Sequence, residues 1–497
     1  MSSMHREKGI ADFLLQHREG EPVSFHMPGH KGAELYKRFG YETFLSNFMD
    51  CDITEIHGAD NLFQAESIIK YTMNRYKELY EVRKSYLLVN GTSCGLIAAI
   101  MTAVKPGGRL IMARNCHKSV FNALTLGNIS PVYAYPEVIK DSGISGEILP
   151  DEIERLLTEN PDAEAVIIPS PNYYGICSDI KSIAELVHQK GKSLIVDQAH
   201  GAHLKFFSRF TDSKDNREDG HLLPQSAEEC GADIVVNSIH KTLASFTQSA
   251  VLNVNTDKID LGELEDKLQM MESTSPSYLL MASLDINADL LEGSGKSLIQ
   301  DWKYNLTEFY KAAGKIEGLK VINTGSNMDW TKINLDMSFC GLSGHELEKY
   351  LMRENIFVEL VTGNIVMCMT GIGNVTEDYE RLLQVLRKIS ETNMSGQQKE
   401  AENHARVDFA ELSKDIPRQE KLHEIPKKKK HVALEQAQGL VCALSIIPYP
   451  PGIPLICPGE LISREAMEYV KALRDAGEKV MGIDENNQVL VGDQESL

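Results

Sequence analysis

The sequence predicts an α/β protein built around a mostly parallel seven-stranded sheet that is covered by helices. Seven short, nearly continuous apolar runs predict the strands: 85–89, 109–113, 131–134, 163–169, 193–197, 233–238 and 250–255. Segments such as 151–158 and 179–190 lie between these runs and have the apolar spacing of helices. Asp151 and Asp179 are acids typical of helix starts. Repeated strand–helix units with apolar strands indicate a parallel sheet buried on both faces.

The first 294 residues divide into an arm and a large domain. Residues 1–60 are expected to form an N-terminal arm, with a short helix near 9–17 and the turn-rich segment 25–32. Residues 61–294 contain all seven predicted strands and form the expected large domain. Within it, residues 211–229 are polar and acidic, which indicates a surface excursion.

The rest of the chain predicts two smaller units. A small α/β domain is expected over 295–392, with strands near 320–323 and 332–335 and a helix near 344–354. Residues 393–430 are hydrophilic and end in four lysines, which we interpret as a solvated linker, with a polyanion site as the less favoured alternative. Residues 431–497 form the expected C-terminal domain.

Composition excludes several classes of partner. The chain has 497 residues, of which 42% are hydrophobic and 25% charged, as in globular proteins of two or three domains. Its net charge of -20 argues against nucleic acid and anionic membranes as partners. The nine cysteines have no metal-site spacing, which predicts reduced thiols and no metal centre. Without a signal-like start or an apolar run of about 18 residues, we expect a cytoplasmic protein.

A lysine and an aspartate follow two of the apolar runs. Lys241 comes shortly after the run 233–238, and Asp197 ends the run 193–197. In a parallel sheet both would lie at the carboxyl ends of strands, where such folds bind ligands. The pair suits pyridoxal phosphate, since the amine forms a Schiff base and the carboxylate keeps the ring nitrogen protonated. Alone, Lys241 would be interpreted as a surface residue; together with Asp197 it predicts this cofactor.

A glycine turn predicts the site for the cofactor phosphate. Residues 90–95, Asn-Gly-Thr-Ser-Cys-Gly, follow the first sheet strand and open an apolar helix at 96–104. The N–H groups of a helix start, together with two hydroxyls, form an anion site. Such a turn also caps ordinary helices, but this one belongs to the same sheet as Lys241. Ser238 and His240 flank the lysine and can donate to the same phosphate.

The strand ends also carry histidines and a small residue. His117 follows the run 109–113, where it can stack on a cofactor ring or simply cap a helix. His200 and His203 leave the same alternatives open. Ala199 would share the face of Asp197 if the strand continues, and its small side chain would leave room for a flat ring.

Six motifs in order give the chain a family resemblance. The motifs are Met27-Pro28-Gly29-His30-Lys31-Gly32, Gly91-Thr92-Ser93, Arg114-Asn115-Cys116-His117-Lys118-Ser119, Asp197-Gln198-Ala199-His200-Gly201, Ser238-Ile239-His240-Lys241-Thr242 and Tyr449-Pro450-Pro451-Gly452-Ile453-Pro454 with Pro458-Gly459-Glu460. With these motifs the chain resembles the bacterial Orn/Lys/Arg decarboxylases, pyridoxal-phosphate enzymes of fold type I with the aspartate-aminotransferase fold. Within this family it is similar to the shorter branch, which resembles arginine decarboxylases.

The resemblance implies a role for each motif residue. Lys241 would form the Schiff base, Asp197 would partner the ring nitrogen, and His117 would stack on the ring. Further cofactor contacts are expected from Thr92, Ser93, the backbone of Cys94, Ala199, His200, Ser238 and His240. His200 is also counted among the catalytic residues. Two departures, Gln198 where Glu is common and Asn90 where His or Gln is usual, can alter substrate preference.

The implied activity is decarboxylation of a basic L-amino acid, arginine ahead of lysine and ornithine. The resemblance also implies a homodimer or larger homo-oligomer with the active site at the subunit interface. We expect carboxylates to recognise the distal cation of the substrate. Glu460 is the candidate; the alternative is a helix-start acid before a helix at 461–473.

Two other functions remain open at this point. An aminotransferase or another lyase on the same fold would clamp the α-carboxylate with an arginine such as Arg353, Arg381 or Arg387. A decarboxylase avoids such a clamp, because it stabilises the charge that must be lost. A catalytically silent regulatory relative is disfavoured, since both Lys241 and Asp197 are present.

Overall fold

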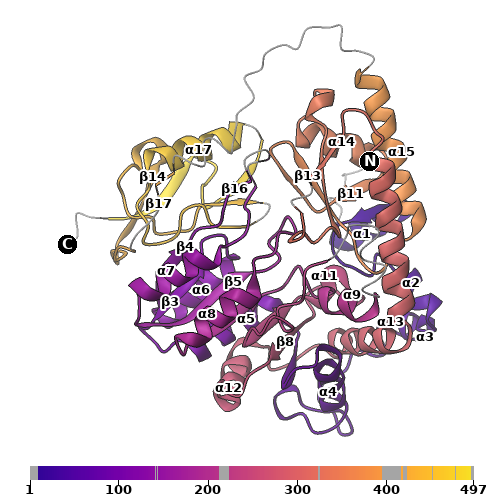
Figure 1. The fold of residues 1–497 in the computed structure, drawn as a ribbon, viewed down its shortest axis with the longest axis horizontal. Helices are drawn as coiled ribbons and strands as arrows, with labels where there is room; N and C mark the ends of the chain where they lie inside the picture. The colour runs from indigo at the N-terminus through magenta and orange to yellow at the C-terminus, as the bar shows by residue number, and fades with distance from the viewer. Residues whose placement is uncertain are drawn as a thin grey trace, which may run out of the picture.

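A seven-stranded sheet lies at the centre of the large domain (Figure 1). This computed structural model describes residues 9–139, 142, 144–211, 223–322, 325–394, 416–417, 422–449, 452–475 and 477–493. The strand order is β2-β8-β7-β6-β5-β3-β4, and β8 runs in the opposite direction to the other six strands. The strands are β2 Lys84–Leu88, β3 Arg109–Ala113, β4 Ser130–Ala134, β5 Ala163–Pro169, β6 Ser193–Asp197, β7 Ile234–Asn237 and β8 Ala250–Val254. The predicted mostly parallel sheet is confirmed, with each strand boundary within one residue.

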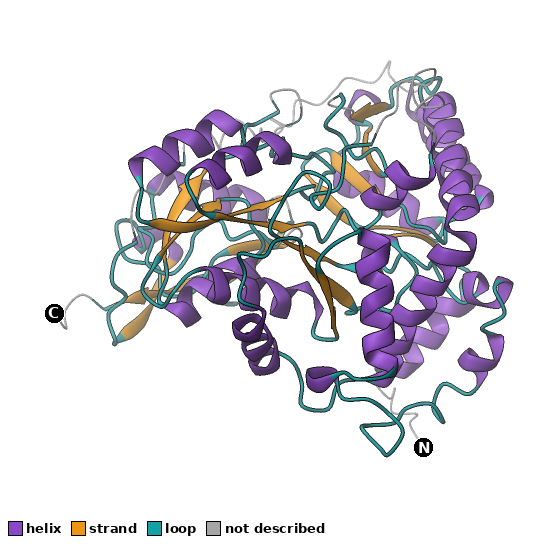
Figure 2. Ribbon diagram, turned by 60° about the horizontal axis from the view of Figure 1, so that its bottom comes forward, coloured by secondary structure: helices purple, strands orange, loops and turns teal. Residues whose placement is uncertain are grey.

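Helices cover both faces of this sheet (Figure 2). Successive residues of β2 belong to different apolar cores, because neighbouring strand residues point to opposite faces. Leu87 packs with α4 Ile68–Tyr80, α9 Leu204–Phe210 and α13 Tyr278–Ala313. Leu88 packs on the other face, whose helices are α5 Gly91–Ala103, α6 Lys118–Gly127, α7 Pro150–Glu159, α8 Ile180–Gln189 and α12 Leu261–Met271.

The predicted helix starts follow from local hydrogen bonding. Asp179 caps α8, since its side chain accepts the Ser182 N–H at 3.1 Å. Asp151 lies in the first turn of α7, beside Pro150 at the first helical position. Both acids stand where the helix dipole favours negative charge.

The small domain is a four-stranded antiparallel sheet flanked by helices. The long helix α13 leads into it, and its strand order is β12-β13-β10-β9. Its elements are β9 Lys320–Ile322, β10 Lys332–Asp336, β12 Leu360–Thr362, β13 Ile365–Met369, α14 Gly344–Arg353 and α15 Thr376–Met394, with the short helix η2 Ser338–Cys340. Residue 323, at the end of the first predicted strand, lies outside the described residues.

The N-terminal arm packs on the small domain. Its elements are α1 Ile10–Glu19, β1 Val23–Phe25, α2 Glu34–Arg38 and α3 Glu42–Ser46, and the short helix η1 Leu62–Gln64 follows it. Strand β1 pairs in parallel with β11 Ile356–Val358, so the arm shares a two-stranded ribbon with the small domain. The short helix predicted near 9–17 is present.

Two glycines bring the arm, the small domain and the segment after Lys241 into backbone contact. A Cβ on Gly29 would collide with the backbone of Thr242, and one on Gly371 would lie 2.7 Å from the Gly29 Cα. The Ile372 N–H donates to the Thr242 carbonyl at 2.9 Å. No side chain fits between these three segments, so glycine is required at both positions.

The C-terminal unit lies beside the β4 edge of the large sheet (Figure 1). It contains α17 Arg464–Asp475, the short helix η3 Leu434–Gln436 and the antiparallel strand pairs β14 Lys429–Ala433 with β17 Gln488–Gly492 and β15 Ile447–Tyr449 with β16 Lys479–Met481. Its strand β14 begins at Lys429, so the last two lysines of the basic run belong to a strand. Most of the expected linker and excursion, with Pro450 and Pro451, lies outside the described residues. None of the described helices is both long and apolar enough to cross a membrane.

Candidate active site

Lys241 and Asp197 meet at the carboxyl edge of the large sheet. Asp197 ends β6, and Lys241 lies in the short helix α11 Ile239–Thr242, which follows the neighbouring parallel strand β7. Both line a cavity of about 670 Å³ between the large domain, the arm and the small domain. The sheet topology therefore brings together two residues that are distant in the sequence, as predicted.

The amine of Lys241 contacts a histidine and a tyrosine ring. Its Nζ lies 2.9 Å from His200 Nε2 and 6.0 Å from the centre of the Tyr173 ring. Burial lowers the pKa of Lys241, while the Asp197 and Glu359 carboxylates oppose that shift. A lowered pKa favours the free amine, which is the nucleophilic form.

Asp197 is buried, and its side chain accepts a hydrogen bond from a backbone N–H. Its Oδ1 accepts the Ala199 N–H at 3.1 Å. Burial raises the pKa of Asp197, and the Lys241 cation opposes that rise. A buried carboxylate with so few donors gains most from a cationic neighbour. Strand β6 ends at Asp197 and does not continue to Ala199, but Ala199 does line the cavity.

The glycine turn opens helix α5 toward the cavity. Gly91 has φ +77°, and α5 begins at that residue, earlier than the predicted 96–104 segment. Thr92 and Ser93 line the cavity with Ser238, and the Thr92 and Ser238 hydroxyl oxygens lie 3.2 Å apart. Free N–H groups and hydroxyls at a helix start form a binding site for a phosphate.

The thiol of Cys94 is hydrogen-bonded at the start of α5. Its Sγ donates to the Gly91 carbonyl at 2.9 Å and to Glu272 Oε1 at 3.1 Å. Burial and the Glu272 carboxylate raise the pKa of Cys94 well above its usual value. The thiol is therefore held neutral, and Cys94 is not among the described residues that line the cavity.

Two further histidines line the cavity in their neutral form. Burial lowers the pKa of both His117 and His240 to about 4. His117 Nδ1 accepts the Ser119 N–H, so this residue caps α6 and lines the cavity at once. The Nδ1 of His240 lies 2.8 Å from the Ser249 carbonyl, which fixes the imidazole of the residue before Lys241.

Gln198 and Asn90, the two departures from the family pattern, have different surroundings. Gln198 does not line the cavity; its Nε2 donates to Glu228 Oε2 at 2.9 Å, and Asn237 and Asn253 donate to the other oxygen of that buried carboxylate. A glutamate at position 198 would place a second acid against Glu228, so glutamine fits this network. Asn90 lines the cavity, and its backbone and side-chain amides bind the end of α12.

Several cavity residues carried no sequence signal of their own. They are His26, Asn172, Tyr173, Gln248 and Glu359. Glu359 lies between β11 and β12, and its Oε2 accepts the Met27 N–H at 2.9 Å. It is a small-domain carboxylate brought to Lys241 by tertiary packing, which a single sequence does not reveal.

Glu460, the expected substrate contact, is not brought to this cavity. It is 1% exposed, and its Oε2 accepts from Arg114 Nη2 at 3.1 Å and from the Cys457 N–H at 2.7 Å. Arg114 also donates to the carbonyls of Pro454 and Leu455. The alternative, that Glu460 is a helix-start acid, is not met either, because α17 begins four residues after it. Glu460 instead ties the C-terminal unit to the end of β3.

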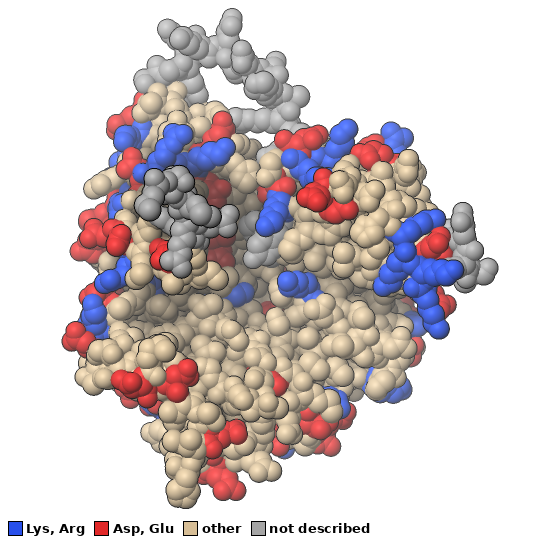
Figure 3. Space-filling view, turned by 180° about the vertical axis from the view of Figure 1, so that it is seen from behind, with Lys and Arg blue, Asp and Glu red and all other residues tan. Residues whose placement is uncertain are grey.

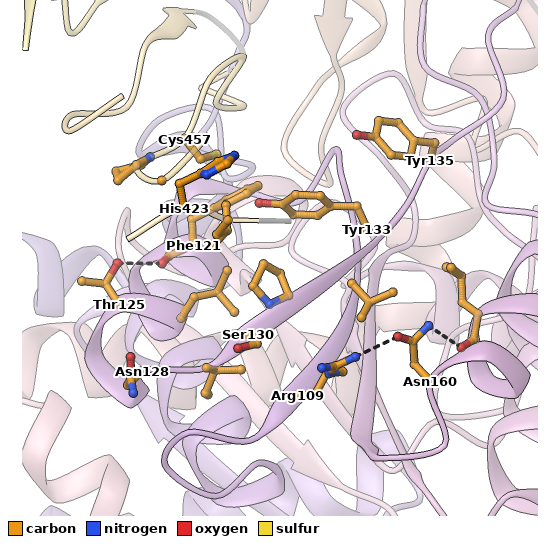
Figure 4. Close-up of a pocket in the computed structure, with 18 of the residues that line it drawn as sticks. Arg109, Phe121, Thr125, Asn128, Ser130, Tyr133, Tyr135, Asn160, His423 and Cys457 are labelled. Atoms are coloured by element: carbon orange, nitrogen blue, oxygen red, sulfur yellow. Dashed lines mark hydrogen bonds between the residues drawn. The ribbon is translucent and has the colours of Figure 1, made fainter. Parts of the chain in front are cut away.

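A second cavity, of about 970 Å³, lies between the β4 edge and the C-terminal unit (Figure 4). Phe121 and Tyr133 come from the large domain, while His423 and Cys457 come from the C-terminal side. Among the described residues, the two cavities share no lining residue. The larger cavity is therefore separate from the Lys241 site.

Unpartnered polar atoms show that the Lys241 cavity fits pyridoxal phosphate. Among the described residues, Asn115 Oδ1 and His200 Nδ1 are buried without a hydrogen-bond partner. Burying such atoms unsatisfied is costly, so they mark positions that a polar ligand completes. An amine, a carboxylate and a helix start with hydroxyls are the three features that this cofactor requires.

Fold and site together define the fold-type I class of pyridoxal-phosphate enzymes. The profile of the Orn/Lys/Arg decarboxylase major domain matches residues 10–329, and that of the C-terminal domain of the same family matches residues 399–495. The chain belongs to the Orn/Lys/Arg decarboxylase family, as its motifs predicted.

Individual relatives agree with this assignment. The chain is 32% identical to an arginine decarboxylase of Bacillus subtilis, over 95% of each chain. It is 23% identical to the inducible lysine decarboxylase of Escherichia coli, over 94% of this chain and 77% of that one. The solved structure of lysine decarboxylase A from Pseudomonas aeruginosa superposes with a TM-score of 0.73 at 19% identity, over 97% of this chain and 80% of that one.

Proposed function

We propose that the Lys241 cavity binds pyridoxal phosphate and that the chain decarboxylates a basic L-amino acid, arginine ahead of lysine and ornithine. The observation that carries this proposal is a small-domain carboxylate, Glu359, that lines the same cavity as Lys241 and favours its cation. The preference for arginine rests on the similarity to arginine decarboxylases. Measuring carbon dioxide release across a panel of amino acids tests the activity and its specificity.

Each residue then has a defined task around the cofactor. Lys241 is the covalent attachment point, and Asp197 holds a proton on the ring nitrogen. When bound, the cofactor withdraws the electron pair that decarboxylation leaves on the substrate. His117 offers a neutral, flat face for the ring, and His200 exchanges a proton with the Lys241 amine at 2.9 Å.

Contacts to the phosphate are proposed for the turn at the start of α5 and for the residues before Lys241. The contributing groups are Thr92, Ser93, the Cys94 backbone, Ser238 and His240. Ala199 lines the cavity with a small side chain, which leaves space beside Asp197 for the ring. The first five of these groups would hold the cofactor by its phosphate.

Glu359 is proposed to bind the distal cation of the substrate. Its Oε2 is held by the Met27 N–H, so the carboxylate is oriented before substrate arrives. A carboxylate can form a charge-assisted, bidentate pair with a guanidinium, which selects by geometry as well as charge. This assignment takes the place of the one expected for Glu460.

Glu359→Gln is expected to raise the KM for the best basic substrate by about 10-fold to 100-fold, because a charge-assisted bond contributes about 1.5–3 kcal/mol. Turnover at saturation should change much less. Steady-state kinetics with arginine, lysine and ornithine measures both parameters. Glu377→Gln, an exposed carboxylate in the first turn of α15, is the matched control. An unchanged KM in Glu359→Gln would remove this residue from substrate recognition.

An aminotransferase is the second candidate, and the surroundings of the cavity speak against it. None of the described residues that line the Lys241 cavity is an arginine. Arg381 donates to the Glu354 carbonyl at 2.7 Å, Arg353 stacks on Tyr350, and Arg387 is exposed. A test with a 2-oxo acid separates the two reactions, because only an aminotransferase would convert it. A silent regulatory relative would bind no cofactor and show no visible absorbance.

We infer that two copies of the chain associate as a homodimer or larger homo-oligomer. Large apolar side chains are exposed in the arm and on α4, among them Met49, Ile56 and Tyr71. Charged side chains are sparse over the large domain on the face shown in Figure 3. Exposed apolar surface of this kind is typical of subunit interfaces.

Sedimentation of the protein at its working concentration is expected to give a dimer or a larger species. Met49→Asp with Ile56→Asp should shift the protein toward smaller species, because each change places a charge on the apolar surface. Lys349→Asp, an exposed position on α14, is the control. A fully active wild-type monomer would contradict the inference.

A further inference from the structure

Four polar side chains are wholly buried between the large and small domains, behind the Lys241 cavity. They are His203, Asp329, Thr331 and Lys332, each 0% exposed. None of the four lines the cavity, and the roles proposed above do not use them. Burying charge without partners is costly, so this cluster depends on its internal contacts.

Lys332, the first residue of β10, is fully paired. Its Nζ donates to Asp329 Oδ2 at 2.9 Å, to the His200 carbonyl at 2.8 Å and to Thr331 Oγ1 at 3.3 Å. These three acceptors match the three donors of an ammonium group. The stem of Lys332 also packs on Gly175, where a Cβ would lie 3.1 Å from its Cγ.

The cluster contacts residues next to Lys241 at two points. The first is His200, whose carbonyl is bound by Lys332 and whose Nε2 lies 2.9 Å from Lys241 Nζ. The second is Thr242, whose Oγ1 lies 3.2 Å from His203 Nδ1. Asp329 joins the two, since its Oδ1 lies 3.2 Å from His203 Nε2. Small-domain residues thus bind the partner of Lys241 directly and reach Thr242 through His203.

The electrostatics agree with this geometry. Burial alone would raise the pKa of Asp329, but Lys332 and His203 hold it well below its usual value. Burial lowers the pKa of His200, and the cations of Lys241 and Lys332 lower it further. The groups that act on Lys241 are Asp197 and Glu359, which favour its cation, and Lys332, which disfavours it.

A purely structural explanation does not account for this arrangement. A domain junction of the same volume can be filled by apolar side chains, often with equal or greater stability. A buried ion pair is useful where it fixes one geometry. Here the fixed geometry is that of the His200 backbone and of the segment that carries Lys241.

We propose that Lys332, held by Asp329, is a positioning residue that fixes the His200 imidazole against the Lys241 amine. The inference rests on the proposed function, in which Lys241 is the reacting amine. Because Lys332 lies in β10, the geometry of the contact between His200 and Lys241 also depends on the position of the small domain.

Three variants test the proposal. Lys332→Met removes the donor to His200 but leaves the Asp329 charge unpaired, which threatens folding. Lys332→Met combined with Asp329→Asn removes both charges and keeps the volume. Lys388→Met is the control, because Lys388 makes an exposed ion pair with Glu354 at 3.2 Å in the same domain.

The readouts are kcat, KM, the unfolding temperature and the pH midpoint of the visible absorption of the bound cofactor. Lys332→Met is expected to raise that midpoint by about one pH unit, because a cation near Lys241 is lost. In both Lys332 variants we expect kcat to fall about 10-fold with KM within about twofold. The double variant should keep the unfolding temperature, and Lys388→Met should change nothing.

A folded double variant with wild-type kcat would overturn the proposal, and so would a lowered unfolding temperature as its sole effect. Failure of the proposed function looks different, since the wild type would then bind no cofactor. In that case the pH dependence of Lys241 labelling by an amine-reactive reagent, read by peptide mass spectrometry, decides the matter. An unchanged labelling midpoint in Lys332→Met would overturn the proposal.

Discussion

Lys241→Ala is expected to abolish decarboxylation, lowering turnover by at least about 1,000-fold, on the order of the loss seen when a covalent catalytic residue is removed. The same change should eliminate the covalent link between protein and cofactor. Borohydride reduction followed by tryptic mapping measures the link, and carbon dioxide release measures the activity. The physical reason is that Lys241 is the amine that the sheet places beside Asp197, with a pKa lowered by burial.

Two other lysines, which donate to the carbonyls of the cavity residues His26 and His200, make this a sharp test. Lys31 donates to the Met369 carbonyl at 3.0 Å, and burial lowers its pKa to about 7, so it too can present a free amine. Lys332 lies behind the His200 loop. Reduced cofactor on the Lys31 or Lys332 peptide in the wild type would contradict the assignment. Lys118→Ala, an exposed position at the start of α6, should retain the link.

Asp197→Ala is expected to slow turnover by at least about 10-fold, because a charge-assisted hydrogen bond contributes about 1.5–3 kcal/mol and tenfold in rate corresponds to about 1.4 kcal/mol. The ring nitrogen loses the carboxylate that keeps it protonated, so the loss should exceed that figure. Rate measurements, together with the absorption spectrum of the bound cofactor, check both effects.

Asp197→Asn separates charge from packing. It keeps an oxygen that can accept the Ala199 N–H but lacks the charge, so it should be nearly as slow as Asp197→Ala. Asp233→Asn is the matched control: this buried aspartate lies just before β7, at the far end of the same strands, where it accepts the Leu194 N–H. Near-normal turnover in Asp197→Ala would mean that another group protonates the ring.

The large sheet could be predicted because its signals are local. Each strand is a short apolar run that ends in polar residues, and each βα unit repeats that pattern. The topology of a parallel sheet then places strand ends together, which is why the sequence alone predicts that Lys241 and Asp197 lie near each other. His117 shows the limit of this reasoning, since its two alternative roles proved compatible in one side chain.

The residues that escaped prediction come from other parts of the fold. Glu359 lies in a turn between two short strands of the small domain and reaches Lys241 only through domain packing. Glu460 belongs to a family motif, but its partner is Arg114, which lies at the end of a strand more than 300 residues earlier. Such pairings depend on tertiary geometry, which charge and spacing along one sequence do not encode.

The glycine junction has a mechanical consequence. Because Gly29 and Gly371 bring three backbones into contact beside Thr242, no flexible side chain can absorb relative motion there. The hydrogen bond from the Ile372 N–H to the Thr242 carbonyl also fixes the orientation of these two segments relative to each other. A tilt of the small domain would therefore also move the short helix that carries Lys241, because the two backbones are in direct contact.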